Sequence, residues 1–400
     1  MQRLLFVISS LDSGGAQRAL SNIVTNLSSN WDIDILLSHT EVINYPYRGN
    51  IISLNLREPN DRTSLLYQFC VTIKRFFILL NLKKQKKYTA CISFLASANI
   101  VNILTGNKYS KTIISIRSDY RYEGLTAIIR FVNIIENKIY KKADIIIPVS
   151  ESIREHFINK HNFLPSKLKT IYNGYNLNNY IKNRVNPING SKDAVFTFIT
   201  TGRLSQQKGH WHLIRVFAQL VKKHPNCELC ILGEGPLRPY LEMLVSGYNI
   251  KNNVHLPGFV NDTLNYYQQP ACFVLSSLYE GLPNVVIEAM MCGMPIISCD
   301  CFSGPREILA PGTDINHQLK EGIEYASYGL LVPVCSGIKH NVDEPLEYEE
   351  QVLLSAMEIM LTQDDMRQKY KDLSIQRSKD FSIENIIKQW EQVINDTCSK

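Results

Sequence analysis

Four charged side chains have the types and the spacing of a site that binds a phosphorylated sugar. Arg203 and Lys208 lie in the loop GRLSQQKG, and Glu280 and Glu288 lie eight positions apart in the segment EGLPNVVIEA. A guanidinium and an ammonium group suit the oxygens of a diphosphate, whereas a carboxylate accepts hydrogen bonds from the hydroxyl groups of a ribose or another sugar. Charge on a surface loop is the competing interpretation of Arg203 and Lys208. If one sheet edge carries all four residues, they form a nucleotide-sugar site.

The second glutamate falls in a short helix that is otherwise apolar. Asn284 suits the N-cap of a helix over Val285–Cys292, and Gly293 suits the position after its last turn. Because the helix is apolar on every side except at Glu288, the pattern predicts a buried carboxylate. A buried carboxylate must be hydrogen-bonded, so Glu288 faces either a polar network in the core or a ligand. A glutamate that reaches solvent from a marginal helix is the third interpretation.

Composition predicts a globular protein with two domains. The chain has 400 residues, of which 45% are hydrophobic and 20% are charged. A net charge of +6 is too small to indicate nucleic acid binding, although it permits an anionic partner or a membrane surface. The ten cysteines are scattered, and no spacing typical of a metal site is present. Cys227 and Cys230 form a CxxC pair inside an apparent strand, which favours core packing over redox chemistry or zinc binding.

One basic segment could bring the protein to a membrane surface. Residues 71–88 read VTIKRFFILLNLKKQKKY, which combines an aromatic and aliphatic stripe with basic residues from Lys74 to Lys87. Such a segment can lie on an anionic bilayer, and a surface helix with solvated lysines fits it equally well. We expect no signal peptide, and no apolar run approaches the ~18 residues that span a bilayer. Together with the free thiols, these features predict a cytoplasmic protein, which the basic segment could hold at the inner face of the plasma membrane.

Strands and helices alternate in both halves of the chain, which predicts an α/β fold with two successive parallel sheets. Strands are expected at 4–9, 34–38, 51–54, 90–94, 112–116, 144–149, 195–200, 227–232, 254–256, 271–275, 295–299 and 329–333. Late helices are expected from about 262 and at 346–361, 364–378 and 382–397. An Asn-rich stretch without periodicity, 176–193, is the expected linker.

Two further positions lie where ligands of parallel sheets bind, at the carboxyl ends of strands. Gly14 and Gly15 form a turn between the first strand and a helix, where backbone N–H groups can hold a phosphate, although such a turn can equally be a structural cap. Arg117 opens the segment Arg117-Ser118-Asp119 directly after a strand. An ordinary surface ion pair would look the same as a ligand site there.

Five motifs in order resemble the large retaining family of nucleotide-sugar glycosyltransferases, glycosyltransferase family 4 or group 1. They are GGAQR (14–18), GRLSQQKG (202–209), ILGEGPLR (231–238), EGLPNVVIEA (280–289) and YGLLVPV (328–334). The resemblance implies the GT-B fold, with two Rossmann-like domains that face each other across a cleft. Residues 1–175 would bind the acceptor and 194–380 the donor, and a helix at 381–400 would return to the first domain.

The resemblance also implies a role for each matching residue. Arg203 and Lys208 would neutralise the diphosphate and stabilise the leaving group, Glu288 would hold the ribose, and Glu280 would contact the transferred sugar with a catalytic role. The remaining donor contacts would come from Gly15, Gly258, Phe259, Gly281, Leu282, Pro283 and Asn284. Gln17 stands where many relatives have an acid, so a charged role at that position is in doubt. Arg117 matches none of these motifs, but its place directly after a strand makes it the expected acceptor contact.

The activity implied is a retaining, metal-independent hexosyl transfer that needs no cofactor. The segment DCFSGPREIL (300–309) resembles transferases of bacterial surface-polysaccharide assembly. For that class we expect a hexose or N-acetylhexosamine, a UDP-sugar donor, and a glycan or polyprenyl-diphosphate-linked acceptor. A UDP-sugar epimerase or a phosphorylase on the same fold and a non-catalytic binding subunit are the alternatives. A nicotinamide-dependent oxidoreductase is less favoured because the first glycine turn lacks G-x-G-x-x-G.

Overall fold

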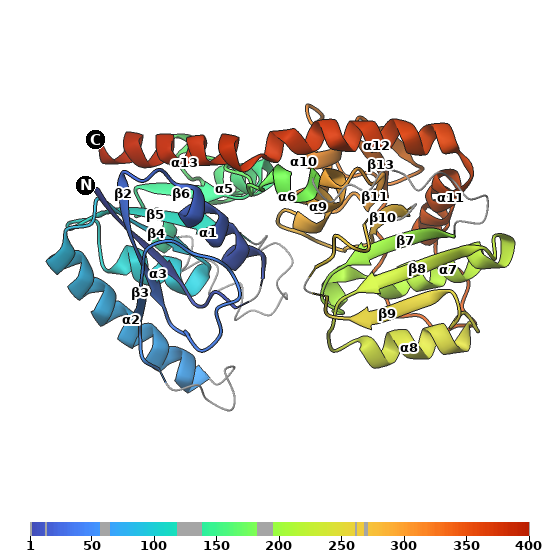
Figure 1. Ribbon diagram of the computed structural model, residues 1–400, viewed down its shortest axis with the longest axis horizontal. Helices are drawn as coiled ribbons and strands as arrows, with labels where there is room; N and C mark the ends of the chain where they lie inside the picture. Colours follow the sequence, from blue (N-terminus) through green and yellow to red (C-terminus); the bar gives the residue numbers. More distant parts are fainter. Residues whose placement is uncertain are drawn as a thin grey trace. The chain divides into compact units, whose positions relative to one another are not determined.

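The computed structural model describes residues 2–12, 14–56, 65–117, 138–181, 195–260, 262–267 and 271–399. The chain divides into two compact units, each drawn in Figure 1. Unit 1 comprises Met1–Tyr175 together with Phe381–Lys400, and unit 2 comprises Asn176–Asp380. The chain therefore leaves unit 1, forms unit 2, and returns to unit 1.

The described part of unit 1 contains a six-stranded sheet in which all strand pairs are parallel, as predicted. The strands are β1 (Gln2–Ile8), β2 (Trp31–Leu37), β3 (Asn50–Ser53), β4 (Ala90–Phe94), β5 (Lys111–Ile116) and β6 (Ile145–Pro148). They are ordered β3-β2-β1-β4-β5-β6. The direction of progression reverses between β1 and β4, and this reversal is the point at which open α/β sheets bind ligands.

Helices cover both faces of the unit 1 sheet. They are α1 (Gly15–Asn26), α2 (Leu65–Lys86), α3 (Ala96–Leu104), α5 (Glu151–His161) and α13 (Ile383–Cys398). Phe6 packs in one apolar cluster with Trp390 of α13, and Val7 packs in another with Leu79 of α2. Because neighbouring strand residues face opposite layers, both faces are buried, which explains the continuous apolar runs in the sequence.

Two of the basic residues of α2 do not reach solvent, which neither interpretation of this segment foresaw. Lys83 is buried, and its Nζ donates to the carbonyl oxygens of Asn102 (2.9 Å) and Gly106 (3.2 Å) at the end of α3. A cation there satisfies carbonyl groups that the helix leaves unpaired. Arg75 is also buried, and its guanidinium donates to the hydroxyl groups of Ser38 and Ser97.

Unit 2 has, among its described residues, a seven-stranded sheet ordered β12-β13-β11-β10-β7-β8-β9. The strands are β7 (Phe196–Thr201), β8 (Cys227–Leu232), β9 (Val254–Gly258), β10 (Ala271–Leu275), β11 (Ile296–Cys299), β12 (Glu324–Ala326) and β13 (Gly329–Val332). All pairs are parallel except β12 with β13. The sequence did not predict β12, because three residues around an exposed tyrosine leave no apolar run. The reversal of order falls between β7 and β10.

The helices of unit 2 are α6 (Leu177–Ile181), α7 (His210–Lys223), α8 (Arg238–Gly247), α9 (Asn284–Met291), α10 (Pro305–Leu309), α11 (Tyr348–Thr362) and α12 (Asp364–Ser378). Phe217 of α7, Leu241 of α8 and Leu353 of α11 share one apolar core with the sheet. Elsewhere in unit 2, α12 packs against α9. The Rossmann-like alternation predicted for this half is confirmed.

One local prediction fails in this half. The helix expected from about 262 is a single turn over the described residues 262–267, in which Tyr266 and Tyr267 donate backbone hydrogen bonds to Thr263. Asp262 Oδ1 accepts the Leu264 N–H (3.0 Å), and such a local side-chain bond competes with helix formation. Within the expected linker, α6 forms a short helix, and residues 182–193 lie outside the described chain.

The cysteine pair of β8 is confirmed as a packing feature. Cys227 and Cys230 are both buried, and desolvation raises the pKa of each thiol to about 11. Both therefore remain protonated at neutral pH and are poor nucleophiles. Among the helices that the structure describes, none combines the length and the apolar character needed to cross a membrane.

Candidate functional site

The four charged residues that opened the sequence analysis come from loops and a helix beside the reversal point of unit 2. β7 and β10 are neighbours in the sheet, so the chain segments that follow them leave from the same edge. The segment after β7 carries Arg203 and Lys208, and the segment after β10 carries Glu280 and then Glu288 on α9. This is the edge at which α/β sheets bind ligands. Sequence separation alone could not show that these segments are adjacent.

Close backbone packing holds the loop after β7. Gly202 N–H donates to Leu232 O (2.9 Å), Leu204 N–H donates to Glu234 O (2.9 Å), and Gly233 N–H donates to Gly258 O (2.8 Å). Gly233 has φ of +147°, and a Cβ at this position would collide with the carbonyl oxygen of Gly202. The glycine is therefore required for the loops after β7, β8 and β9 to stack. Gly258 is part of this stack, and the next side chain, Phe259, is 69% exposed.

Lys208 and Glu280 form a partly buried ion pair. Lys208 Nζ lies 2.6 Å from Glu280 Oε1, and the two side chains are 15% and 7% exposed. The same carboxylate oxygen accepts a hydrogen bond from Ser277 Oγ at 2.6 Å. Leu278 N–H donates to Gln207 O (2.8 Å), and Ser276 Oγ donates to Lys208 O (2.9 Å). These bonds fix the loop after β7 to the loop after β10.

Arg203 differs from Lys208 in having no fixed partner. It is exposed, and within the described chain it makes no ion pair or side-chain hydrogen bond. Its guanidinium is therefore available to an anion without first leaving a protein carboxylate. The two predicted diphosphate ligands thus start from different states: Arg203 is free, and Lys208 is bound to Glu280.

Glu288 is buried in the first turns of α9, as its apolar surroundings predicted. Tyr267 lies close to it: burial first, and then the nearby Glu288 charge, raises the pKa of the Tyr267 hydroxyl. That hydroxyl lies 3.0 Å from Thr201 Oγ1, at the end of β7. The prediction of Asn284 as N-cap is wrong by one residue, because Pro283 is the N-cap and Asn284 begins the helix. A shift of one residue is the usual uncertainty at helix ends.

The bend at Gly281, Leu282 and Pro283 is held by the segment after β11. Ser303 Oγ lies 2.9 Å from Glu280 O and 2.7 Å from Gly281 O, so its hydroxyl donates to this bend. Gly304 packs against the bend with φ of +95°, and a Cβ there would collide with Pro283 Cδ. The sequence identified this segment only by resemblance and did not predict that it supports the bend.

A buried ion pair network anchors the segment that carries Ser303. Arg306 Nη2 lies 2.6 Å from Asp300 Oδ2 and 2.7 Å from Glu324 Oε2. Asp300 Oδ2 also accepts the Leu319 N–H at 2.7 Å. Asp300 and Arg306 flank Ser303 and Gly304 in sequence, so the network fixes both ends of the turn that supports the bend.

Replacing Gly304 with alanine is expected to displace the bend and weaken donor binding. Loss of positioning of about one ångström can cost on the order of 100-fold, so we expect the KM for a nucleotide sugar to rise about 10- to 100-fold. Gly312→Ala is the matched control, because Gly312 also has positive φ (+85°) but a Cβ there meets nothing within 4 Å. Steady-state kinetics on the two variants measure the difference. If the two variants had equal KM values, displacement of the bend would not explain the change, and backbone strain common to both positions would account for it.

Sequence reasoning missed His210, which begins α7 directly after Gly209. The residue is 2% exposed, and its Nδ1 has no hydrogen-bond partner. Burial, together with the charge of Lys208, lowers the pKa of His210 to about 3, so the imidazole is neutral at physiological pH. His210 is therefore a buried, neutral neighbour of Lys208. Only its place beside the motif could have indicated it.

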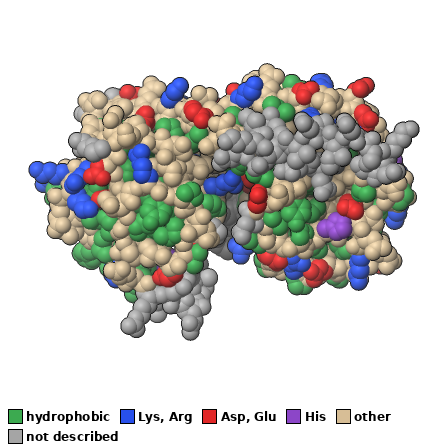
Figure 2. Space-filling view, in the orientation of Figure 1, with side chains coloured by type: hydrophobic (Ala, Val, Ile, Leu, Met, Phe, Trp, Pro, Cys, Tyr) green, Lys and Arg blue, Asp and Glu red, His purple; other side chains and the backbone are tan. Residues whose placement is uncertain are grey.

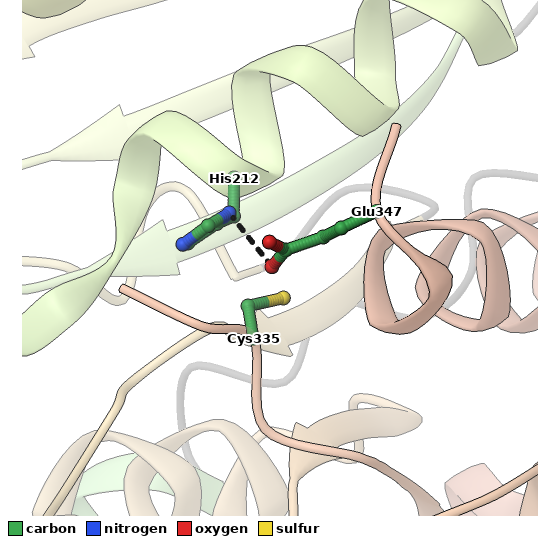
Figure 3. Close-up of side chains that lie close together, drawn as sticks. All are labelled: His212, Cys335 and Glu347. Atoms are coloured by element: carbon green, nitrogen blue, oxygen red, sulfur yellow. Dashed lines mark ion pairs between the residues drawn. The ribbon is translucent and has the colours of Figure 1, made fainter. Parts of the chain in front are cut away.

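Sequence reasoning also missed a cluster with the side-chain types of a metal site. Figure 3 shows His212 of α7, Cys335 and Glu347 with their ligand atoms within 4.8 Å of one another. Gly337 N–H donates to His212 Nε2 (3.2 Å), which places the imidazole proton on Nδ1, and Nδ1 donates to Glu350 Oε1 (2.8 Å). Because both ring nitrogens are occupied, the cluster acts as a hydrogen-bonded support for the start of α7.

In unit 1, the structure places Gly15 and Arg117 at the corresponding edge. Gly15 begins α1, and Arg117 directly follows β5. Arg117 Nη1 donates to Asn173 Oδ1 at 2.5 Å, and no carboxylate among the described residues forms an ion pair with Arg117. Ser118 and Asp119 lie outside the described residues.

A cavity of about 620 Å³ lies at the other edge of the unit 1 sheet. Its lining includes the first residues of β1 and β2 and one charged side chain, Glu391 of α13. Glu391 already accepts the Ser28 N–H at 2.8 Å. No predicted site residue lines this cavity, and the amino edge of a parallel sheet is not where its ligands bind.

Comparison with known proteins agrees with this geometry. The family model described as Glycosyltransferase Family 4 matches residues 13–179, and the one described as Glycosyl transferases group 1 matches residues 182–321. The uncharacterized glycosyltransferase MJ1059 of Methanocaldococcus jannaschii is 35% identical, over 88% of this chain and 89% of that protein. A Campylobacter jejuni protein named N-acetylgalactosamine-N,N'-diacetylbacillosaminyl-diphospho-undecaprenol 4-alpha-N-acetylgalactosaminyltransferase is 28% identical, over 95% of this chain and 96% of its own.

Solved structures show the same fold at low sequence identity. HepE of Anabaena in complex with UDP and glucose superposes with a TM-score of 0.74 at 17% identity, covering 99% of this chain and 100% of that one. Sucrose-phosphate synthase of Thermosynechococcus elongatus gives a TM-score of 0.76 at 19% identity, covering 99% of each chain. The matched motifs, the two Rossmann-like units and these relatives agree, and the chain belongs to the group 1, family 4 glycosyltransferases, which have the GT-B fold.

Proposed function

We propose that this protein transfers a hexose or an N-acetylhexosamine from a UDP-sugar to a glycan or a polyprenyl-diphosphate-linked acceptor. The observation that carries this proposal is the reversal point of unit 2. There, the loop after β7 carries an exposed Arg203, unpaired among the described residues, and Lys208, which pairs with Glu280 of the loop after β10. The buried Glu288 follows on α9. The set provides cations for a diphosphate and carboxylates for sugar hydroxyl groups.

The relatives support the choice of donor and acceptor. The Campylobacter relative is named for transfer of N-acetylgalactosamine to a lipid-linked diphosphate acceptor, and the HepE structures contain UDP. A second Campylobacter relative, 26% identical over 98% of both chains, is also named for an undecaprenol-linked acceptor. We therefore propose a role in the assembly of a bacterial surface polysaccharide or lipid-linked glycan.

The mechanism that fits these residues is transfer with retention at the anomeric carbon. As the bond to the donor sugar breaks, negative charge accumulates on the departing diphosphate, and Arg203 and Lys208 stabilise it. Donors positioned where charge develops are often the largest catalytic contribution. The acceptor hydroxyl would attack from the face that the diphosphate leaves, and a phosphate oxygen would take its proton. In this proposal the two cations supply the positive charge that a metal ion supplies elsewhere, and Glu280 orients the sugar.

A panel of UDP-, GDP- and ADP-sugars tests the proposal. We expect saturable binding and slow hydrolysis of UDP-sugars, and we expect Arg203→Ala and Glu288→Ala to weaken both. Release of UDP should increase when a suitable glycan or lipid-linked acceptor is added. Conversion of the nucleotide sugar to an isomer in the absence of acceptor would instead identify an epimerase. Binding of no nucleotide sugar, with both variants equal to the wild type, would contradict the assignment.

We also propose that α2 holds the protein on an anionic membrane surface. Phe69, Ile73 and Phe77 lie one helical turn apart and are 63%, 41% and 64% exposed. Lys74 and Lys84 are exposed on the same helix. Figure 2 shows hydrophobic side chains gathered on this face of unit 1, with basic side chains at its margin. An exposed apolar stripe beside cations is typical of helices that lie at a lipid interface.

Replacing Phe69 and Phe77 with serine is expected to weaken binding to phosphatidylglycerol liposomes about 10-fold or more, because each phenyl ring loses its apolar burial in the lipid. Lys74→Ala with Lys84→Ala should weaken binding mainly at low salt, because surface charge is screened. Lys83 is left unchanged, since it is buried. Co-sedimentation with liposomes measures the effect, with Leu164→Ser, an exposed apolar residue elsewhere in unit 1, as control. Equal binding by all variants would contradict the membrane role.

A further inference from the structure

Arg117 is a partly exposed residue at the ligand-binding edge of unit 1, with buried guanidinium nitrogens and no acidic partner among the described residues. It follows β5 directly, and β5 is paired with β4, which is one of the two strands at the reversal point. No carboxylate of the described chain forms an ion pair with it. Burial lowers the pKa of Arg117 to about 9, so the guanidinium still carries its charge at neutral pH.

Aromatic rings and one amide fix the orientation of this guanidinium. Its Cζ lies 4.9 Å from the ring centroid of Phe94 and 6.0 Å from that of Trp390. The two rings are themselves stacked, with centroids 6.0 Å apart and an angle of 25° between their planes. Nη1 donates to Asn173 Oδ1 at 2.5 Å. A planar cation over aromatic faces with one nitrogen anchored cannot turn freely.

The remaining donors of this cluster have no acceptor in the part of the chain that the structure describes. Nε and Nη2 of Arg117 are buried and make no hydrogen bond, and the same is true of Nε1 of Trp390. Buried donors are almost always paired, so three orphaned donors on two residues in contact are exceptional. Groups that can only donate require an acceptor as their partner. The cluster is therefore rich in donors and deficient in acceptors.

Nε and Nη2 form the edge of a guanidinium that binds two oxygens of a phosphate or a carboxylate side by side. In Arg117, both nitrogens of this edge are without a hydrogen-bond partner among the described residues, whereas Nη1 donates to Asn173. We propose that Arg117 and Trp390 form an oxyanion-binding site in unit 1 that takes a phosphate or carboxylate group of the acceptor. This inference rests on the proposed function, because it names the chemical class of the acceptor. Arg117 as a whole is partly exposed, although Nε and Nη2 themselves are buried.

The competing account is purely structural. In it, Arg117 completes the packing of Phe94 and Trp390, and its vacant edge holds a trapped water. That account predicts no response to added anions and no dependence of transfer on the charge of the acceptor. The two accounts therefore differ in measurements made on the wild-type protein as well as on variants.

The indole resonance of Trp390 provides a test that does not require the acceptor to be known. The chain has three tryptophans, so three indole N–H signals are expected in a ¹H–¹⁵N spectrum; Trp31→Phe and Trp211→Phe assign two of them, and the third belongs to Trp390. Inorganic pyrophosphate is added to full-length protein that carries Arg203→Gln and Lys208→Gln, which removes binding at the donor site. We expect the Trp390 signal to shift saturably and the Trp31 signal to stay in place. An unchanged Trp390 signal would overturn the proposal.

Variants of Arg117 test the same site. Arg117→Gln and Arg117→Lys should abolish the pyrophosphate-dependent shift, because neither supplies the two-nitrogen edge. Arg154→Gln is the control, since Arg154 is a partly exposed arginine of unit 1 that pairs with Glu151. A shift that persists in both Arg117 variants would overturn the assignment. If Arg117→Gln does not fold, the pyrophosphate titrations of Arg117→Lys and of the protein with Arg117 intact still test the site.

Acceptor kinetics identify which oxyanion is bound. Three forms of one glycan are compared as acceptors. The first is a neutral glycoside, the second is linked to a diphosphate, and the third carries a uronic acid in place of a neutral sugar. In the wild type, kcat/KM should favour one charged form over the neutral one, and Arg117→Gln should reduce that preference on the order of 10- to 100-fold, as expected for charge-assisted hydrogen bonds. An unchanged preference would refute the site. Absence of UDP-sugar hydrolysis by the wild type would instead refute the proposed function, and the pyrophosphate titration would still report on Arg117.

Discussion

Lys208→Ala is expected to lower kcat for sugar transfer on the order of 100- to 1,000-fold, the usual effect of removing one group that stabilises a departing oxyanion. The structure adds a second consequence, because Lys208 is also the ion pair partner of the buried Glu280. Removing one member of a buried pair leaves the other charge uncompensated, which typically costs about 3–5 kcal/mol. The single variant should therefore be both slow and less stable. Single-turnover kinetics and urea unfolding measure the two effects separately.

The double variant Lys208→Ala with Glu280→Gln separates stability from catalysis. It removes both charges, so the unfolding free energy should recover by a large part of the loss, while the rate stays low. Lys222→Ala is the control, since Lys222 is an exposed lysine of α7 whose side chain contacts Gln219. If the double variant regained the wild-type rate, Lys208 would serve only to compensate the charge of Glu280. Stabilisation of the departing diphosphate by Lys208 would then be excluded.

Glu350→Gln is expected to destabilise unit 2 by about 3–5 kcal/mol, because it removes the only carboxylate that the described chain pairs with the buried Arg215. Arg215 Nε lies 2.9 Å from Glu350 Oε1, and His212 Nδ1 lies 2.8 Å from the same atom. Both residues belong to α7, so the network holds the helix that begins directly after the Lys208 loop. Urea-dependent hydrogen exchange in α7 measures the loss.

The same network should make the stability of unit 2 depend on pH. Burial alone would raise the pKa of Glu350, but hydrogen bonds from His212 and Arg215 outweigh it and lower the pKa. A lowered pKa in the folded state means that the contribution to stability is complete above the unfolded carboxyl value of about 4.3. It is lost as the pH falls through the lower folded value. Wild-type α7 should therefore lose protection in this acidic range more steeply than Glu350→Gln.

The matched control for this prediction is Glu242→Gln in the same unit. Glu242 pairs with Arg238, but its side chain is 53% exposed. Exposed ion pairs contribute about 0–1 kcal/mol, so this variant should resemble the wild type in both measurements. If Glu242→Gln and Glu350→Gln lost equal stability, burial would not be the reason that the Glu350 network matters.

Most of the fold could be predicted from the sequence, because strands that are buried on both faces must be apolar along their whole length. β1 and β10 are recognisable for that reason alone. β12 was missed because an edge strand of three residues needs no apolar run. The turn at 262–267 was taken for a helix because Asp262 suits a helix start, whereas its side chain bonds the Leu264 N–H in a local turn. Long-range context decides such elements.

The candidate site could be predicted only as far as its residue types. Arg203, Lys208, Glu280 and Glu288 were identified, but the Lys208–Glu280 pair joins residues 72 positions apart and depends on β7 lying beside β10. Periodicity could have shown that Arg75 and Lys83 share a helix face with Val71 and Leu79, and therefore turn inward. The carbonyl groups that accept from Lys83 belong to Asn102 of α3 and to Gly106 just after it, and no local sequence pattern predicts this contact.

The return of the chain to unit 1 through α13 has a consequence for how the protein is made. Ile383, Ile386, Trp390 and Ile394 belong to the same apolar core as β1 and α1. During translation, these side chains emerge only after the whole of unit 2. Domains generally fold as units during synthesis, in the order in which they leave the ribosome. Unit 2 can therefore complete its core first, and unit 1, although it begins the chain, must wait with an open hydrophobic face.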